Sequence, residues 1–411
     1  MIHTVQLRRF LPKEVYEAVR IDKKYEFRYQ KGKGYFTTKY IDLGLNEVKM
    51  TKYSNGVVTY YYMDFIVNLN LFFYANDLSG EDINRYRNTP LQGNMVGAMH
   101  IYGLYAEIIK IFPLLNKCEY SLEDIDVKNN GSNWGLVEKW QTDNHYSFSL
   151  SEIDYTYDIP LPFVDTYLKV LNYSHQPTST NRIRHNHEYG EDNLYEINGS
   201  IKINTYDKER ELMERFGDSA NAQRHQVLRV EVGLKRRKLS YLVRQDKYPN
   251  IEERTLFDFV DIDTGYDMVS KYMHQRCYRG DIYDYQTAVS MVENNKNIKT
   301  NMKTKLKAVL YGVQYHRGVD KFIKNYVEVG GNEETVKSHI KRLEDLGINP
   351  VTISRRDKSG FPLPDGGRVL PSIFTIIDKM HVIEKDNKEH PEKVFELMGA
   401  VSYEMIESDD I

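Results

Sequence analysis

The chain has 411 residues, of which 41% are hydrophobic and 28% charged, and its formal net charge is −3. This length allows two or three domains with sizeable cores, and the absence of a run of eighteen apolar residues argues against a membrane span. The first residues lack the layout of a signal peptide, and two cysteines are too few for a disulfide framework. We therefore expect a cytoplasmic protein.

Basic residues and tyrosines are the unusual features of the composition. Residues 224–244 carry seven Lys or Arg side chains against the single acid Glu231, and the chain contains 33 tyrosines. Aromatic side chains mixed with cations are typical of proteins that bind single-stranded nucleic acid by stacking and phosphate contact. An AT-rich genome, whose codons favour Tyr, Asn, Lys and Ile, explains the same excess equally well.

The first third of the chain alternates between apolar and polar residues over several short runs. This period of two predicts a run of strands within residues 1–75, with a turn at Asn55-Gly56. Residues 92–115 instead carry apolar side chains at helical spacing and predict a long, buried helix that stops at Pro113.

A second strand region covers residues 146–159. Its apolar positions are even up to Leu150 and odd from Ile153 onward, which predicts a bulge near Ser151. Beyond the bulge one face of the strand would carry a row of acidic side chains. Their carboxylates repel one another unless a cation lies beside them. The alternative interpretation is a strand face that is exposed to solvent. Residues 161–173 predict a helix.

Residues 194–244 read as hairpin, strand, helix, strand and basic helix. The dipeptide Asn198-Gly199 predicts the hairpin turn. In the strand that follows, the period of two places Tyr206 and Lys208 on one polar face, and in the next strand it places Arg229 and Glu231 on the side away from the apolar residues. A tyrosine, a carboxylate and cations would then meet on one open face of the sheet if these strands are neighbours.

The loop between the helix predicted at residues 161–173 and the hairpin contains His185 and His187. Two histidines at this spacing occur as metal ligands on a strand in some DNA-nicking enzymes. The residue between them is Asn and the surroundings are loop-like, so we interpret them as part of a DNA-contacting or solvated loop.

The sequence becomes helical after residue 250, which predicts domains at 1–250 and 251–411. Residues 318–347 predict a helix-turn-helix whose second helix is capped by Asn332 and offers Lys337, Lys341 and Arg342 to DNA. An ordinary pair of antiparallel helices has the same pattern. We expect RRDKSGFPLPDGGR to be a loop, followed by a short α/β or helical segment.

Four segments in a fixed order resemble the gene II/X family of phage and plasmid replication proteins. They are INTYDKEREL, VLRVEVGLKRRKL, LYGVQYHRGVDKF and TVKSHIKRLEDLGI. Upstream, SLSEIDYTYDIPLPFVDTYLKVLNYS is similar to the family's strand with an Ile-Asp pair and the helix after it. The resemblance covers roughly residues 146–350, and the first 90 residues match the family poorly.

This resemblance implies an α+β fold, in which an antiparallel-sheet nuclease domain with an HUH-like or RRM-like sheet precedes a mostly helical C-terminal domain. It implies a rolling-circle DNA replication initiator that nicks one strand at an origin, keeps the 5′-phosphate on a tyrosine, and later religates. The catalytic motif matches Tyr206 and Lys208. The reaction calls for Mg²⁺ or Mn²⁺, for which Asp154, Glu231 and Glu152 are candidate ligands, with Asp64 as a further candidate.

The implied partners are origin DNA, a host helicase and a host DNA polymerase, with no membrane. The candidate DNA contacts are Arg229, Lys235, Arg236, Arg237, Lys238, Lys337, Lys341 and Arg342. Two other functions fit the same sequence: a conjugative relaxase, which performs the same chemistry for transfer, and a helix-turn-helix DNA-binding protein without catalysis.

Overall fold

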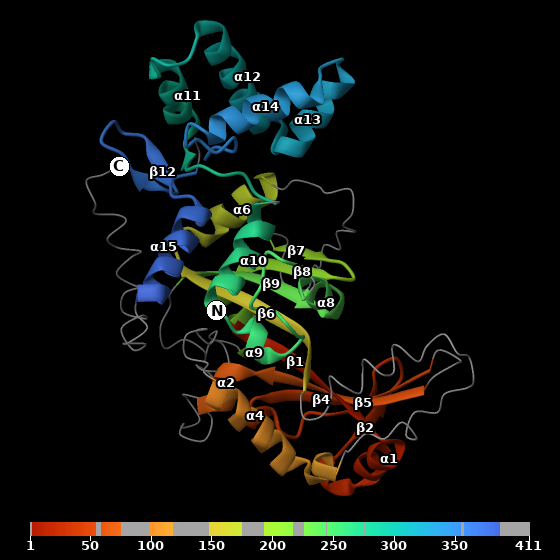
Figure 1. Cartoon of the computed structure of the whole chain (residues 1–411). Helices are drawn as coiled ribbons and strands as arrows, with labels where there is room; N and C mark the ends of the chain where they lie inside the picture. The colour runs from red at the N-terminus through yellow and green to blue at the C-terminus, as the bar shows by residue number, and fades with distance from the viewer. Residues whose placement is uncertain are drawn as a thin grey trace. The chain divides into compact units, whose positions relative to one another are not determined.

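The computed structural model describes residues 2–54, 59–74, 98–117, 148–174, 193–216, 226–243, 245–274, 276–354 and 357–386. A large antiparallel sheet occupies the earlier part of the chain, and a mostly helical region follows it (Figure 1). The predicted α+β class is therefore confirmed. In the described part of the chain, every helix is too short or too polar to cross a lipid bilayer.

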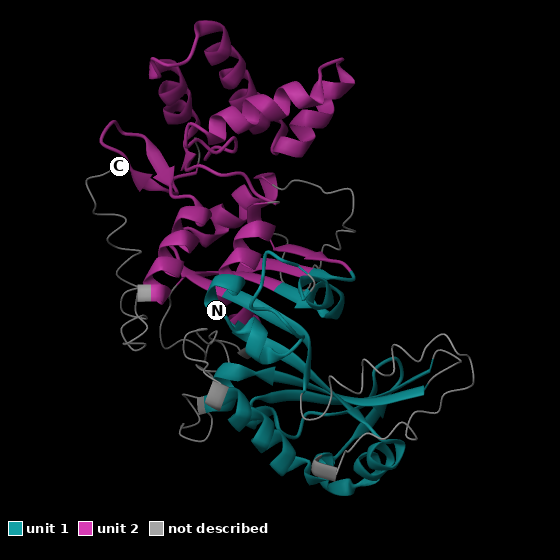
Figure 2. Cartoon of the chain, viewed as in Figure 1, with its two compact units in different colours: residues 1–156, 199–201, 233–265 teal, residues 157–198, 202–232, 266–411 magenta. Residues whose placement is uncertain are grey.

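The chain forms two compact units (Figure 2). The first unit comprises residues 1–156, 199–201 and 233–265, and the second comprises residues 157–198, 202–232 and 266–411. This division differs from the division at residue 250, which followed the change from strands to helices along the sequence. The two divisions differ because the strands at residues 149–160 and 227–235 each contribute residues to both units.

The sheet of the first unit has the strand order β2-β3-β4-β5-β1-β6. Neighbouring strands in this series are antiparallel. The strands are β1 (Ile2–Leu11), β2 (Arg28–Gln30), β3 (Gly34–Thr37), β4 (Leu45–Ser54), β5 (Thr59–Asn68) and β6 (Ser149–Pro160). The run of strands predicted within residues 1–75 is confirmed, while the turn at Asn55-Gly56 lies outside the described residues.

Helices cover one face of this sheet. They include α1 (Lys13–Ile21), α2 (Leu69–Tyr74), α4 (Ala98–Ile111) and the 3-10 turn η5 (Pro113–Lys117). Phe65 on β5 packs its ring against Phe112 and Phe148, and all three side chains are fully buried. The helix α4 ends before Pro113, as predicted, because proline cannot donate the backbone hydrogen bond that a continuing helix needs.

The bulge predicted near Ser151 is present. Gln6 of β1 lies opposite Glu152, whereas the next residue, Leu7, lies opposite Leu150, so Ser151 is the extra residue on β6. An extra residue shifts the alternation by one position, which is why the apolar pattern of this strand changes phase.

The second unit contains strands in the order β9-β8-β7. They are β7 (Leu194–Ile197), β8 (Ile201–Asp207) and β9 (Val227–Lys235), and β9 continues into the first unit. Strands β7 and β8 pair antiparallel, which confirms the predicted hairpin. The helix α6 (Val164–Ser174) precedes the hairpin and α7 (Lys208–Phe216) follows it.

The helical region of the second unit comprises α10 to α15 and includes a small sheet. Its helices are α10 (Ile262–His274), α11 (Tyr285–Asn294), α12 (Thr300–His316), α13 (Val319–Glu328), α14 (Glu333–Glu344) and α15 (Ile373–Asp386). Three short strands, β10 (Ile282–Tyr283), β11 (Phe361–Pro362) and β12 (Arg368–Leu370), pair antiparallel in the order β10-β12-β11.

The prediction of a loop for RRDKSGFPLPDGGR was wrong in part. Residues 361–370 form a hairpin in which the Leu363 amide donates to the Gly367 carbonyl at 2.8 Å, and Gly366 has a φ of 84°. Glycine adopts this left-handed conformation without steric cost. The two strands are too short to show an alternating pattern, so only the turn residues were visible in the sequence.

Candidate active site

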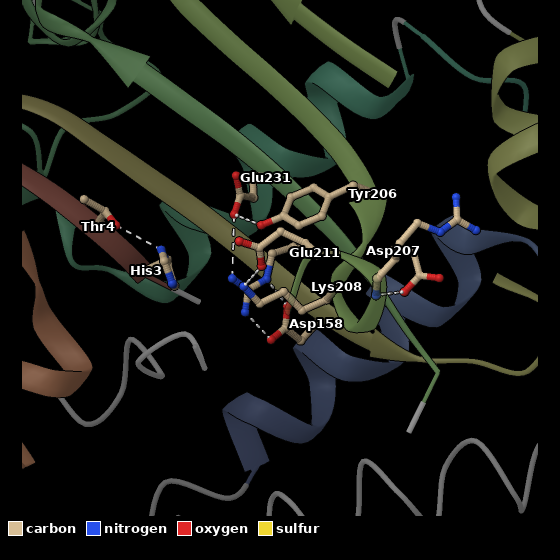
Figure 3. Close-up of polar contacts among 10 residues, drawn as sticks. His3, Thr4, Asp158, Tyr206, Asp207, Lys208, Glu211 and Glu231 are labelled. Atoms are coloured by element: carbon tan, nitrogen blue, oxygen red, sulfur yellow. Dashed lines mark hydrogen bonds and ion pairs between the residues drawn. The ribbon is translucent and has the colours of Figure 1, made fainter. Parts of the chain in front are cut away.

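Six polar or charged side chains meet in the second unit (Figure 3). They come from the end of β6, from β8 and β9, and from the first turn of α7. The members of this cluster are Asp158, Tyr206, Lys208, Glu211, Arg229 and Glu231. Tyr206 was the first candidate from the sequence, and the structure brings it against Glu231.

The Tyr206 hydroxyl donates a hydrogen bond to Glu231 Oε1 at 3.0 Å. Both side chains are buried, with 7% of Tyr206 and 8% of Glu231 exposed, rather than on the open face that we expected. Burial, followed by the charge of Glu231, raises the pKa of Tyr206 well above its ordinary value. Tyr206 is therefore a neutral phenol at rest, and the Glu231 carboxylate is the group positioned to receive its proton.

Arg229 is the more deeply buried of the two cations in the cluster. Its side chain is 0% exposed, its Nε and Nη2 donate to the two carboxylate oxygens of Asp158, and its Nη1 lies 3.8 Å from Glu231 Oε1. Burial is the largest single effect and would lower the pKa of Arg229. The charge of Asp158, its hydrogen bonds, and the charges of Tyr206 and Glu231 together outweigh burial, so the pKa is raised. We expected Arg229 to contact DNA. This expectation is corrected here, because the guanidinium is enclosed and holds part of the acidic row of β6.

Lys208 lies on α7 and not on the strand face where the alternation placed it. The strand ends at Asp207, whose Oδ1 accepts a hydrogen bond from the Arg210 amide at 3.1 Å and caps the new helix. Lys208 forms an ion pair with Glu211, and its Nζ lies 6.0 Å from the centroid of the Tyr206 ring. Burial, and next the charge of Arg229, lower the pKa of Lys208 to about 8.

Two members of the cluster were not among the candidate residues. Glu211 stands three residues after Lys208, a spacing at which side chains on a helix pair, and this was the available signal. Asp158 belongs to the acidic row that we expected to need a cation, but the sequence did not indicate that Arg229 supplies it.

The remaining metal candidates lie in the first unit. Asp154 is 8% exposed and faces Thr4 across the β1–β6 pair, and Glu152 faces Gln6. Asp64 accepts hydrogen bonds from Arg8 at 2.6 and 2.8 Å, so both of its carboxylate oxygens are engaged.

Within the described ranges, no three His, Cys, Asp or Glu side chains are grouped so that they could hold a metal ion. Glu231 and Asp158 both face the Arg229 guanidinium, which occupies the position that a divalent cation would take between them. The carboxylates of the cluster therefore do not fit a metal ion in this arrangement.

The basic segment after Glu231 lies in the first unit and borders an open hollow. The helix α8 (Arg236–Leu242) begins directly after β9, and Lys238 Nζ lies 4.6 Å from the centroid of the Tyr241 ring. The lining residues are Gly199, Lys235, Arg236, Arg237, Ser240, Tyr241 and Gln245. Three of the four candidate DNA contacts in this segment, Lys235, Arg236 and Arg237, thus share one concave surface.

The predicted helix pair near the C-terminal end is present as α13 and α14, which pack against each other and against α12. Asn332 caps α14, because its Oδ1 accepts a hydrogen bond from the Thr335 amide at 3.1 Å. Lys341 and Arg342 are exposed, and Lys337 pairs with Glu333 at 2.9 Å. The pair of histidines His185 and His187 lies outside the described residues.

Comparisons with protein-family models, with curated proteins and with solved structures give no match for this chain.

Proposed function

We propose that the protein nicks and rejoins DNA as a rolling-circle replication initiator, with Tyr206 as the nucleophile. One observation carries this proposal: the Tyr206 hydroxyl is hydrogen-bonded to a carboxylate, Glu231, inside the segment that resembles the catalytic motif of the gene II/X family. A phenol becomes an effective nucleophile when an adjacent base takes its proton as it attacks.

The proposed nicking step transfers the scissile phosphate from the 3′ oxygen of the DNA to Tyr206. The Tyr206 oxygen attacks phosphorus while its proton passes to Glu231, and the bond between phosphorus and the 3′ oxygen breaks. The DNA is left with its 5′-phosphate on Tyr206, and the leaving 3′ oxygen takes up a proton to become the 3′-hydroxyl primer. Religation is the reverse reaction, in which the 3′-hydroxyl attacks the phosphotyrosine.

Two cations support this chemistry. Arg229 Nη1 lies 3.8 Å from Glu231 Oε1 and places a positive charge beside the reacting groups, where it can stabilise the negative charge of the phosphate under attack. Lys208 has a pKa lowered to about 8 by burial, so it is a group that can give up a proton near neutral pH. In this proposal Lys208 supplies the proton for the leaving 3′ oxygen.

The family resemblance implies that the nicking reaction requires a divalent cation, and this requirement can be measured directly. A chelator titration of the nicking reaction, followed by addition of Mg²⁺ or Mn²⁺, decides whether the reaction depends on metal.

The experiment that tests the proposal uses a labelled origin oligonucleotide and a denaturing gel. Wild-type protein should give a nicked product and a protein-linked band, whereas Tyr206→Phe should give neither, because it lacks the attacking oxygen. Tyr195→Phe is the matched control, since Tyr195 is a neighbouring tyrosine on the adjacent strand β7. Full nicking by Tyr206→Phe contradicts the assignment.

A non-catalytic DNA-binding protein is the second candidate, and the burial of Tyr206 with its raised pKa favours it. In that case the cluster is a structural ion network, and the exposed cations of α8 and α14 bind DNA without cleavage. Origin binding without any covalent product in the same gel would identify this function. A conjugative relaxase would give the covalent product but would not support replication of a plasmid carrying only this gene and its origin.

A further inference from the structure

The first unit has a second feature that the proposed chemistry does not use. Four aromatic side chains lie on one face of its sheet: Phe10 on β1, Tyr60 and Tyr62 on β5, and Tyr53 on β4. Phe10 is directly opposite Tyr62, and Tyr53 is directly opposite Tyr60. Because side chains on one side of a strand recur every two residues, the four rings share a face, which we call the aromatic face.

The rings of the aromatic face form a connected row. Phe10 contacts Tyr62 at 5.7 Å and Tyr60 at 6.4 Å between ring centroids, both edge to face. Tyr60 in turn stacks on Tyr53, with centroids 6.4 Å apart and ring planes 22° from parallel.

This row is on the outside of the sheet. The opposite face carries the fully buried residues Leu7 and Phe65, which form the core under the helices. On the aromatic face, Tyr53 is 53% exposed, and Phe10, Tyr60 and Tyr62 are partly exposed. A row of partly exposed rings offers flat apolar surface to a ligand.

Cations accompany the rings. The Arg8 guanidinium lies 3.8 Å from the centroid of the Tyr62 ring. Arg236 of α8 interacts electrostatically with Arg8, Asp64, Tyr60 and Tyr62, and burial together with repulsion from Arg8 lowers its pKa. Arg8 already donates to both carboxylate oxygens of Asp64. Arg236 is therefore the cation beside these rings to which a bound phosphate would add a counter-charge.

Arg236 also connects the aromatic face to the basic hollow of the same unit. It lines that hollow together with Lys235 and Arg237. The partly exposed rings and the cations of the hollow thus belong to the same unit, with Arg236 near both. A single strand of nucleic acid has bases that could stack on the rings and phosphates that could pair with the cations.

We propose that the aromatic face binds single-stranded DNA, with bases stacked on Tyr53, Tyr60 and Tyr62 and phosphates on Arg236 and the hollow. Unpaired bases can splay out and stack on aromatic rings, whereas bases of a duplex are already stacked on one another. This inference rests on the proposed function for the choice of DNA as the ligand. It assigns to the first unit the task of holding the single strand released or presented at the nick.

The test measures fluorescence anisotropy of a labelled oligothymidine of about 16 nucleotides and of its duplex with oligoadenine. Wild-type protein should bind the single strand more tightly than the duplex. The variant Tyr53→Leu/Tyr60→Leu should bind the single strand about tenfold more weakly, equivalent to about 1.4 kcal/mol. The control Tyr53→Phe/Tyr60→Phe keeps the rings and should bind within about twofold of wild type.

Single-strand binding that is unchanged in the leucine variant overturns the inference, as does equal binding of the duplex. Tighter binding of an oligouridine of the same length would contradict the assignment to DNA.

A second measurement needs no substitution. Oligothymidine that carries photoreactive 5-iodouracil should cross-link wild-type protein at peptides containing Phe10, Tyr60 or Tyr62. Cross-links confined to other peptides would also overturn the inference, whether or not the leucine variant folds.

The binding test on the aromatic face and the nicking test on Tyr206 can succeed or fail independently. Tyr206→Phe should bind the oligothymidine as wild type does, because Tyr206 belongs to the second unit. Nicking with unchanged binding by the leucine variant refutes the aromatic face alone. Ring-dependent binding without any covalent product refutes the nicking alone.

Discussion

The ion pair between Arg229 and Asp158 should be the most costly interaction to break in the cluster. Arg229 is fully buried, and two of its nitrogens donate to Asp158. Asp158→Asn keeps the shape of the side chain but leaves the guanidinium without its main counter-charge. Removing one partner of a buried pair typically destabilises a protein by about 3–5 kcal/mol. Because Glu231 remains 3.8 Å from Arg229, we expect about 3 kcal/mol.

Urea unfolding followed by circular dichroism measures this effect. The double variant Asp158→Leu/Arg229→Met removes both charges and should recover much of the loss, since an apolar pair avoids the cost of burying ions. The exposed pair Lys337–Glu333 provides the control, and Lys337→Ala should cost no more than about 1 kcal/mol. A loss of less than about 1 kcal/mol for Asp158→Asn would refute the reasoning, because it would mean that Arg229 is solvated or otherwise compensated.

Three further predictions concern charge. The pKa of folded Lys208 is about 8, below its ordinary value of 10.5, so the folded protein binds fewer protons than the unfolded chain between these values. Urea midpoints should therefore rise from about pH 7.5 to about pH 9.5 in wild type but not in Lys208→Met. Arg237→Gln/Lys238→Gln should weaken DNA binding equally across sequences and lower the slope of log affinity against log salt by about one unit per lost duplex contact. If α14 reads the origin, Lys341→Ala/Arg342→Ala should reduce discrimination between origin and unrelated duplex in a competition assay, and unchanged discrimination would limit α14 to a structural role.

The sequence predicted the strands and their turns well, because alternation and turn residues are local signals. The phase change between Leu150 and Ile153 located the bulge at Ser151, and Asn198-Gly199 located the hairpin. The cap of α14 by Asn332 followed from its side chain and the acids after it.

Burial of the site could not be predicted in the same way. Alternation shows which residues share a face, but it carries no information on what covers that face. Tyr206, Glu231 and Arg229 were expected on an open surface, and all three are buried. The acidic row of β6 correctly indicated a cation nearby, but choosing Arg229 as that cation requires the tertiary contact with Asp158. Lys208 was placed on a strand because a period of two does not indicate where the strand ends.

The central claim is that Tyr206 becomes covalently linked to DNA. The most direct measurement is mass spectrometry of the protein–DNA product after protease and nuclease digestion, which identifies the residue that carries the nucleotide phosphate. The account predicts a modified peptide from β8 in which Tyr206 bears the phosphate, with no modification in Tyr206→Phe. A phosphate on Tyr195 or another tyrosine, or the absence of any linked peptide under conditions in which the protein binds its origin, would contradict it.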